Sequence, residues 1–146
     1  MFFILIFTSI SMFAEPTNRL KERIKTLKKV KLIEILDLSE DKSEKFMIKY
    51  NTYQSKIDSK NMEVDNAIQE LETVASNKNS KIEIIKLKTN LLQRVQNELV
   101  FIIQEKDKEI KSILNEVEFA KYLVFERKFA NELRKSLLRL NKKRFE

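Results

Sequence analysis

The sequence contains no cysteine and no histidine, and these two absences remove most of the side chains that carry out chemistry in proteins. Thiolate nucleophiles, Ser-His-Asp triads, imidazole acid–base catalysis and zinc sites built from His or Cys are excluded. Carboxylate-only sites remain possible, but no pair of acids stands out along the chain. We therefore expect a protein that is not an enzyme, with no catalytic residue, no bound metal and no cofactor.

Glycine is also absent, and Pro16 is the one proline. Without glycine the chain lacks the usual hairpin turns, which need a positive φ, and it has no Gly-rich phosphate-binding loop. What remains is 42% hydrophobic and 35% charged and is rich in Lys, Glu, Ile, Leu and Asn. These residues recur at helical spacing, so the 146 residues predict one all-α domain.

The N-terminal segment differs from the rest of the chain. Residues 1–13 are almost entirely apolar and are followed by Ala14, Glu15 and Pro16. Such a run is too short to cross a bilayer, which needs roughly 20 residues, but it suits the core of a secretory signal with Ala14 before the cleavage site. We expect a signal peptide at 1-14, a single helical domain at 15-146 without a stable membrane span, and a periplasmic location. A buried N-terminal strand or an uncleaved anchor is the alternative.

The formal net charge of +7 is concentrated at the two ends of the expected mature chain. Basic side chains outnumber acids in residues 19–31 and 127–144, whereas residues 37–72 lean acidic. Basic surfaces can meet nucleic acid, acidic lipid or acidic protein segments. Because an exported protein rarely meets nucleic acid, we expect no nucleic acid as a partner; a nucleic-acid-binding protein is the alternative if the signal does not function.

Two stretches, 76 positions apart, share one template. Residues 38–53 and 114–129 each begin with a leucine, an N-cap residue and acids in the first turn, with aromatics 8 and 15 positions past the leucine. The N-cap residues, Ser39 and Asn115, can accept an orphan backbone N–H, and the acids oppose the positive end of the helix dipole. The repeat predicts two helix starts of the same design.

Apolar residues at steps of three and four predict four helices, over about residues 17–36, 40–75, 80–113 and 115–140. The second and third are joined by a four-residue turn at 76–79 and form a long antiparallel hairpin, with each arm roughly 50 Å long. Such a hairpin, covered by two further helices, makes a thin layer.

Capping patterns mark the starts of the last two helices. Ser80 and Glu83 have the S-x-x-E form of a capping box, and Asn115 and Glu118 form a similar pair. We expect each helix to begin at these residues.

The third helix carries apolar residues on two faces. Its heptad seam consists of Ile82, Ile85, Thr89, Leu92, Gln96, Leu99, Ile103, Lys106, Ile110 and Ile113, and its second stripe of Ile84, Leu87, Leu91 and Val95. A helix that is apolar on two sides contacts more than one partner, and small thin cores are marginal. We predict an antiparallel homodimer with the second stripe in its interface; a compact four-helix bundle that closes by itself is the alternative.

The second helix carries a stripe of lysines. The stripe consists of Lys42, Lys45, Lys49, Lys56 and Lys60, and it borders an aromatic seam of Phe46, Tyr50 and Tyr53. Steps of 3, 4, 7 and 4 place the lysines on one face. These eight residues are the predicted client-binding surface, on which charge governs the rate of capture of acidic unfolded segments. A solvated flank that only keeps the helix soluble is the alternative.

The repeats carry a family resemblance. The segments at 38–53 and 114–134 resemble the periplasmic Spy/CpxP-like family with its LTxxQ repeats, and the similarity covers about residues 19–140. Lys42 and Glu118 stand where the motif has Gln. Two segments carry the resemblance: KFMIKYNTY, and AKYLVFERKF with Leu133-Arg134 after three intervening residues.

The resemblance implies an exported all-α protein that forms a curved antiparallel dimer. It further implies ATP-independent chaperoning of unfolded periplasmic proteins, inhibition of envelope-stress sensor kinases or, in some branches, a response to metals, for which this chain has no His or Cys ligand. We expect a chaperone or envelope-stress accessory protein whose partner is an unfolded protein or an envelope sensor protein. A structural or adaptor helical protein that binds one fixed partner by coiled-coil contacts is the alternative.

Overall fold

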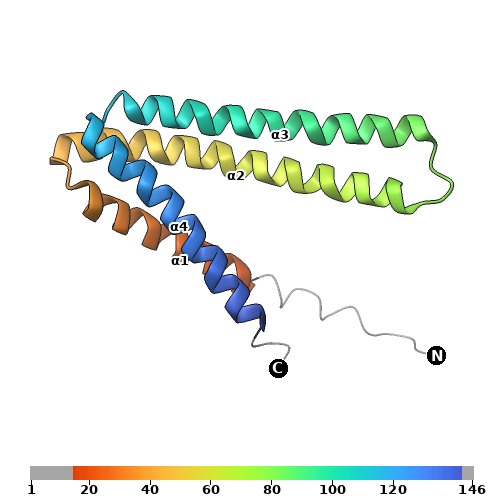
Figure 1. Ribbon diagram of the computed structural model, residues 1–146, viewed down its shortest axis with the longest axis horizontal. Coiled ribbons are helices and arrows are strands. Elements are labelled where there is room, and N and C mark those ends of the chain that lie inside the picture. The colour runs from red at the N-terminus through yellow and green to blue at the C-terminus, as the bar shows by residue number, and fades with distance from the viewer. Residues whose placement is uncertain (1–14, 143–146) are drawn as a thin grey trace, which may run out of the picture. The chain divides into compact units, whose positions relative to one another are not determined.

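The computed structural model describes residues 15–142, with side chains described for residues 19–136. This part of the chain contains four helices and no strand: α1 (Glu15–Leu36), α2 (Glu40–Ser76), α3 (Ile82–Lys111) and α4 (Glu116–Lys142) (Figure 1). The predicted all-α class is confirmed. The expected signal peptide at residues 1–14 lies outside the described residues.

The described residues form two compact units. The hairpin unit, residues 38–119, contains α2, α3 and the first turn of α4. The terminal unit contains the described residues of 1–37 and 120–146, which are α1 and α4 from Ala120 onward. The region that the sequence predicts as one helical domain therefore comprises two packing units, each with its own buried side chains.

In the hairpin unit, α2 and α3 lie side by side along their length (Figure 1), which confirms the predicted hairpin. The helices contain 37 and 30 residues, or roughly 55 and 45 Å of length. The turn between them is built from asparagine and serine: Asn77 Oδ1 accepts the N–H of Asn79 at 3.0 Å, and the Asn77 carbonyl accepts the N–H of Ser80 at 3.0 Å. Side-chain bonding of this kind lets a chain without glycine reverse direction.

The hairpin core runs along the facing sides of α2 and α3. Its buried residues on the two helices are Phe46, Tyr50, Ile57, Val64, Ala67, Val95, Lys106 and Ile110. Leu91, Leu92 and Leu99 pack against the cluster of Val64, Ala67 and Val95. Burial of this apolar surface, more than helix propensity, stabilises helices of this length in water.

Lys106 is a charged residue within this core and is only 5% exposed. Its ammonium lies 5.5 Å from the centroid of the Tyr50 ring, and that ring stacks on Phe46 with 5.7 Å between centroids. The aliphatic stem of a lysine can be buried among apolar groups while its charge faces an aromatic ring. A lysine therefore fits the heptad seam at this position.

The middle of the α3 seam lies one residue away from the prediction. Val95 is buried and Ile102 is half-buried, whereas Gln96 and Ile103 are exposed. Both sets of positions satisfy a period of 3.5 residues, so only the order of the three- and four-residue steps differs. The observed order buries valine in place of glutamine, which avoids burying an amide that would need hydrogen-bond partners.

The capping box at the start of α4 is confirmed. The side chain of Asn115 accepts the N–H of Glu118 at 2.9 Å, and the carboxylate of Glu118 accepts the N–H of Asn115 at 2.7 Å. These two bonds satisfy two of the N–H groups that a helix start leaves without partners.

The predicted capping box at Ser80 and Glu83 is wrong. Helix α3 begins at Ile82 with Lys81 in the N-cap position, and no side chain caps it. Ser80 instead belongs to the turn, where its N–H is bonded to Asn77. Ser80 therefore serves as a turn residue and not as the N-cap residue of α3.

In the terminal unit, α1 ends at Leu36 and is followed by Asp37 in the left-handed region, with φ 48°. The Asp37 N–H donates to the Ile33 carbonyl at 3.1 Å and closes the last turn. Aspartate adopts this conformation more readily than most residues other than glycine. The buried side chains of this unit are Leu32, Leu36, Tyr122 and Phe125.

Candidate functional site

The predicted lysine stripe of α2 is divided by ion pairs within the hairpin unit. Lys49 lies 2.7 Å from the carboxylate of Glu109, and Lys60 lies 2.8 Å from that of Glu98. Lys42 forms an ion pair with Glu118. Three of the five lysines thus bind acids of the same unit.

These ion pairs shift the ionisation of their members. The hydrogen bond from Lys49 lowers the pKa of Glu109, and the same bond raises the pKa of Lys49. Hydrogen bonds with Glu63 and Glu98 raise the pKa of Lys60, and the bond from Lys60 lowers the pKa of Glu98. The pairs favour the charged form of each partner, as expected for opposite charges in contact.

The remaining residues of the predicted surface do not gather on one accessible face. Phe46 and Tyr50 are at most 1% exposed and lie in the hairpin core, because their seam faces α3. Lys45 is exposed, and the Lys56 ammonium stands 4.7 Å from the centroid of the half-buried Tyr53 ring. In contrast to the prediction, a partner arriving from solvent meets Lys45, Lys56 and Tyr53 but not the two other aromatic rings.

The predicted dimer stripe on α3 also divides. Leu91 packs in the hairpin core and Val95 is buried there, because the seam passes through them. Ile84 is 43% exposed and Leu87 is 64% exposed. The part of the stripe that can meet a second protein is therefore its N-terminal half.

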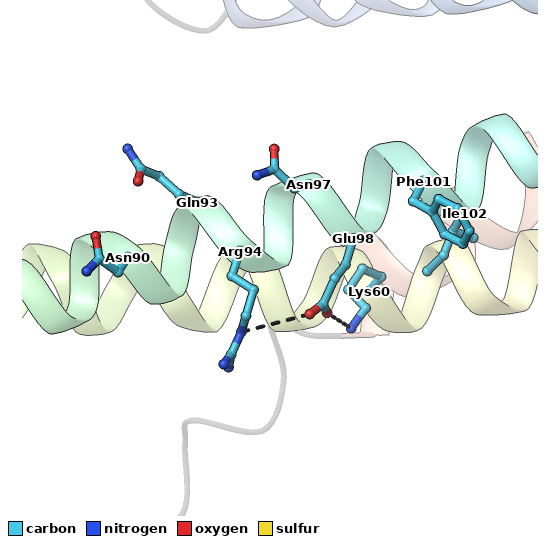
Figure 2. A pocket seen from close by; sticks show the side chains of 8 residues that line it. All are labelled: Lys60, Asn90, Gln93, Arg94, Asn97, Glu98, Phe101 and Ile102. Atoms are coloured by element: carbon cyan, nitrogen blue, oxygen red, sulfur yellow. Dashed lines mark hydrogen bonds and ion pairs between the residues drawn. The ribbon is translucent and has the colours of Figure 1, made fainter.

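A broad hollow of about 710 Å³ lies along α3 in the hairpin unit, and sequence reasoning did not identify it. It is lined by Lys60 of α2 and by Asn90, Gln93, Arg94, Asn97, Glu98, Phe101 and Ile102 of α3 (Figure 2). Figure 2 shows the amides of Gln93 and Asn97 pointing away from α2, while Arg94 and Lys60 reach toward Glu98. The hollow is wide and open, and its charged members already bind one another.

A narrower groove lies between α1 and α4 in the terminal unit. This α1/α4 groove has a volume of about 340 Å³ and is lined by Lys31, Ile35, Lys121, Val124, Phe125, Lys128, Phe129 and Glu132. Beside it, Lys28 joins the two helices through an ion pair of 2.8 Å with Glu126, and its ammonium lies 5.8 Å from the Phe129 ring. The walls of the groove are therefore held by a contact between residues 98 positions apart in the chain.

Helical spacing places the groove residues on common faces. On α4, Lys121, Phe125, Lys128 and Glu132 follow steps of four, three and four, and on α1 Lys31 and Ile35 are four apart. Phe125 is buried and Phe129 half-buried, while Val124 is 54% and Ile35 42% exposed. The groove thus combines a closed aromatic floor with apolar side chains that face solvent.

Charged side chains of the groove are all exposed. Lys31, Lys121 and Lys128 supply three positive charges, and Glu132 supplies one negative charge. The spacing of the α4 residues is visible in the sequence, but the pairing of this face with α1 is not, because the two helices are far apart in the chain. Sequence reasoning therefore found the basic ends but not the groove.

Among the side chains that the structure describes, those of residues 19–136, no group of three or more acids is arranged to bind a metal ion. No helix in the described part of the chain has the length and apolar character needed to cross a membrane.

No protein-family model matches this chain, and no curated protein or solved structure matches it at a significant level.

Proposed function

We propose that this protein is an exported, ATP-independent chaperone or envelope-stress accessory protein that binds unfolded or partner proteins on its helical surface. The observation that carries the proposal is the α1/α4 groove, in which exposed Ile35 and Val124 share the lining with three lysines. Unfolded chains expose apolar side chains and carboxylates together, and this groove offers a complement to both. The resemblance of the repeats to the Spy/CpxP-like family supports the same function.

The lysines and the apolar residues of the groove have different roles in binding. Lysines at the edge attract acidic segments over a distance of about a Debye length, which raises the rate of encounter. Apolar contacts with Val124 and Ile35 then hold the segment, and their limited area keeps the complex reversible. A surface that binds quickly and releases readily suits a chaperone that uses no nucleotide.

The test is suppression of aggregation. The full chain is expressed in a bacterial host, purified from the periplasm, and mixed with two unrelated aggregating clients without ATP. Light scattering should fall for both clients. The variant Ile35→Asn/Val124→Asn should lose this effect, whereas Ile48→Asn/Met62→Asn, which changes side chains of 59% and 62% exposure in the hairpin unit, should keep it. Unchanged scattering for both clients with the unmodified chain would contradict the proposal.

The same material tests export. N-terminal sequencing of the periplasmic protein should begin at Glu15 if the signal is cleaved after Ala14. Recovery of the chain from the cytosol with Met1 retained would contradict both the periplasmic location and the chaperone function.

A structural or adaptor role is the second candidate, and exposed apolar residues on α3 favour it. Ile84 and Leu87, which are three residues apart on one face of α3, are 43% and 64% exposed, and exposed apolar groups that lie together mark interaction surfaces. Through these residues we propose association with a second copy or with one fixed helical partner. Protection of a single client, with no effect on unrelated ones, would favour this role over the chaperone.

A further inference from the structure

The charges of the α1/α4 groove are arranged around its apolar floor rather than gathered at one point. Lys121 and Lys128 are seven residues apart on α4, which separates them by roughly 10 Å along the helix axis. Lys31 comes from the other wall of the groove. A ligand that satisfies all three lysines must therefore carry more than one negative charge, with apolar material between the charges.

We infer that the α1/α4 groove binds short peptide segments in which a large apolar side chain is flanked by aspartate or glutamate. The inference rests on the proposed function and names the class of segment that the groove selects. In a peptide with polyproline II geometry, residues three apart lie on the same side and are about 9 Å apart, so carboxylates at these positions can reach Lys121 and Lys128. One of the two side chains between them can then turn toward Val124 and Phe125.

The dimensions of the groove favour a peptide over a lipid or fatty acid. From Lys121 to Glu132 the lining covers eleven steps of α4, or roughly 16 Å, and Ile35 and Val124 remain open to solvent. Sites for small apolar molecules enclose most of the ligand surface, which this open groove does not. A fatty acid also carries one carboxylate and would leave two of the lysines without a partner.

The two ends of the groove also differ in charge. Glu132 lies at its C-terminal end on α4, beyond Lys128. A carboxylate bound at that end would be repelled, whereas a neutral or basic residue would be accepted there. The groove therefore selects segments whose acids flank the apolar residue but do not continue past it on the Glu132 side.

The experiment measures binding of labelled peptides to the full chain by fluorescence anisotropy at low salt. The probe has a Leu-Phe core flanked by aspartates; in one comparison peptide lysines replace the aspartates, and in another Ser-Asn replaces Leu-Phe. The variant Lys31→Gln/Lys121→Gln/Lys128→Gln removes the three groove lysines. The control Lys78→Gln/Lys81→Gln/Lys86→Gln removes the same charge from exposed positions of the hairpin unit.

We expect the groove variant to bind the aspartate peptide about tenfold more weakly than the unmodified chain, as three solvent-exposed ion pairs together supply. The control variant should change the affinity by less than about threefold, through the general loss of positive charge. Both comparison peptides should bind more weakly than the probe. Added salt should weaken binding of the probe and should reduce the difference in affinity between the two variants.

Three results would overturn the inference. The first is that the groove variant and the control variant bind the probe with equal affinity, and the second is that the unmodified chain binds the lysine and aspartate peptides with equal affinity. The third is that oleate displaces the probe at a lower concentration than unlabelled peptide does. The last result would assign the groove to an anionic amphiphile. Failure of the chaperone proposal is distinguishable, because a chain that binds the probe as described but does not suppress client aggregation supports the peptide specificity and contradicts only the chaperone.

Discussion

Lys42 and Glu118 form an ion pair, and the two residues occupy the same position in the two repeats. Each lies three residues after the N-cap residue that precedes its helix, which is Ser39 before α2 and Asn115 before α4. Glu118 also accepts the Asn115 N–H at 2.7 Å, so one carboxylate both caps α4 and binds α2. The two matching positions of the repeat thus contact each other within the hairpin unit.

Reversing the charge of Lys42 should destabilise the hairpin unit. Lys42→Glu places two carboxylates against each other where an ion pair stood, and we expect a loss of about 1 kcal/mol in the free energy of unfolding. The double variant Lys42→Gln/Glu118→Gln should recover most of that loss, because glutamine can also serve at the third position of a capping box. Urea unfolding followed by circular dichroism measures both. A Lys42→Glu variant as stable as Lys45→Glu, which changes an exposed lysine on the same helix, would contradict the coupling.

The two helix starts of the repeat should respond differently to loss of the N-cap side chain. Asn115 caps α4 through its side chain, whereas Ser39 makes no such bond at α2. Asn115→Ala should therefore lower the free energy of unfolding by about 1 kcal/mol, and Ser39→Ala should change it by only a few tenths. Ser80→Ala is the control for a serine that the sequence predicts to be a cap and that the structure places in a turn. A loss in the free energy of unfolding for Asn115→Ala that is as small as the loss for Ser39→Ala would show that the capping box contributes nothing measurable.

The helices and the hairpin could be predicted from the sequence because their causes are local. Apolar residues at steps of three and four set the helix faces, and a cluster of serine, asparagine and lysine between two long periodic stretches marks the turn. Asn115 and Glu118 form the capping box that their spacing predicts, whereas Ser80 and Glu83 have the same spacing but form none, because Ser80 lies in the turn. Features of this range need no knowledge of the partner helix.

Contacts between distant residues could not be predicted in the same way. The lysines of α2 are regularly spaced, but the acids that bind them lie 38 and 60 positions away. The α1/α4 groove depends on helices from opposite ends of the chain. In each case the sequence shows the spacing of residues on one helix, but only the fold shows which residues of another helix they contact.

The ion pairs of the hairpin predict a stability that falls at both ends of the pH scale. Glu98 and Glu109 have lowered pKa values in the folded state, so their stabilisation is present above the ordinary carboxyl pKa of about 4.3 and is lost as the pH falls through the lowered values. Lys49 and Lys60 have raised pKa values, so their stabilisation is present below the ordinary lysine pKa of about 10.4 and is lost as the pH rises through the raised values.

Thermal unfolding between acid and alkaline pH measures this dependence. Lys49→Gln/Lys60→Gln should have a lower Tm than the unmodified chain near neutral pH, and the difference should shrink toward both extremes. The control Lys45→Gln/Lys78→Gln removes the same charge from exposed positions and should leave the shape of the pH profile unchanged. A constant difference in Tm across the whole range would contradict the role of the ion pairs.

Substitutions on the two parts of the α3 stripe should separate folding from association. Val95 is 5% exposed within the hairpin core, so Val95→Ala should lower the free energy of unfolding by about 1–3 kcal/mol through lost burial and a cavity. Leu87 is 64% exposed, so Leu87→Ala should change the free energy of unfolding by less than about 0.5 kcal/mol.

If the chain forms the proposed dimer through the exposed half of the stripe, Leu87→Glu should weaken association. The unfolding curve of the monomer should stay unchanged, because a charge at that position is costly only when a partner covers it. Sedimentation equilibrium at micromolar concentration measures the association. An unmodified chain that sediments as a monomer would exclude the dimer, and a Leu87→Glu variant that remains fully dimeric would place the interface on another face.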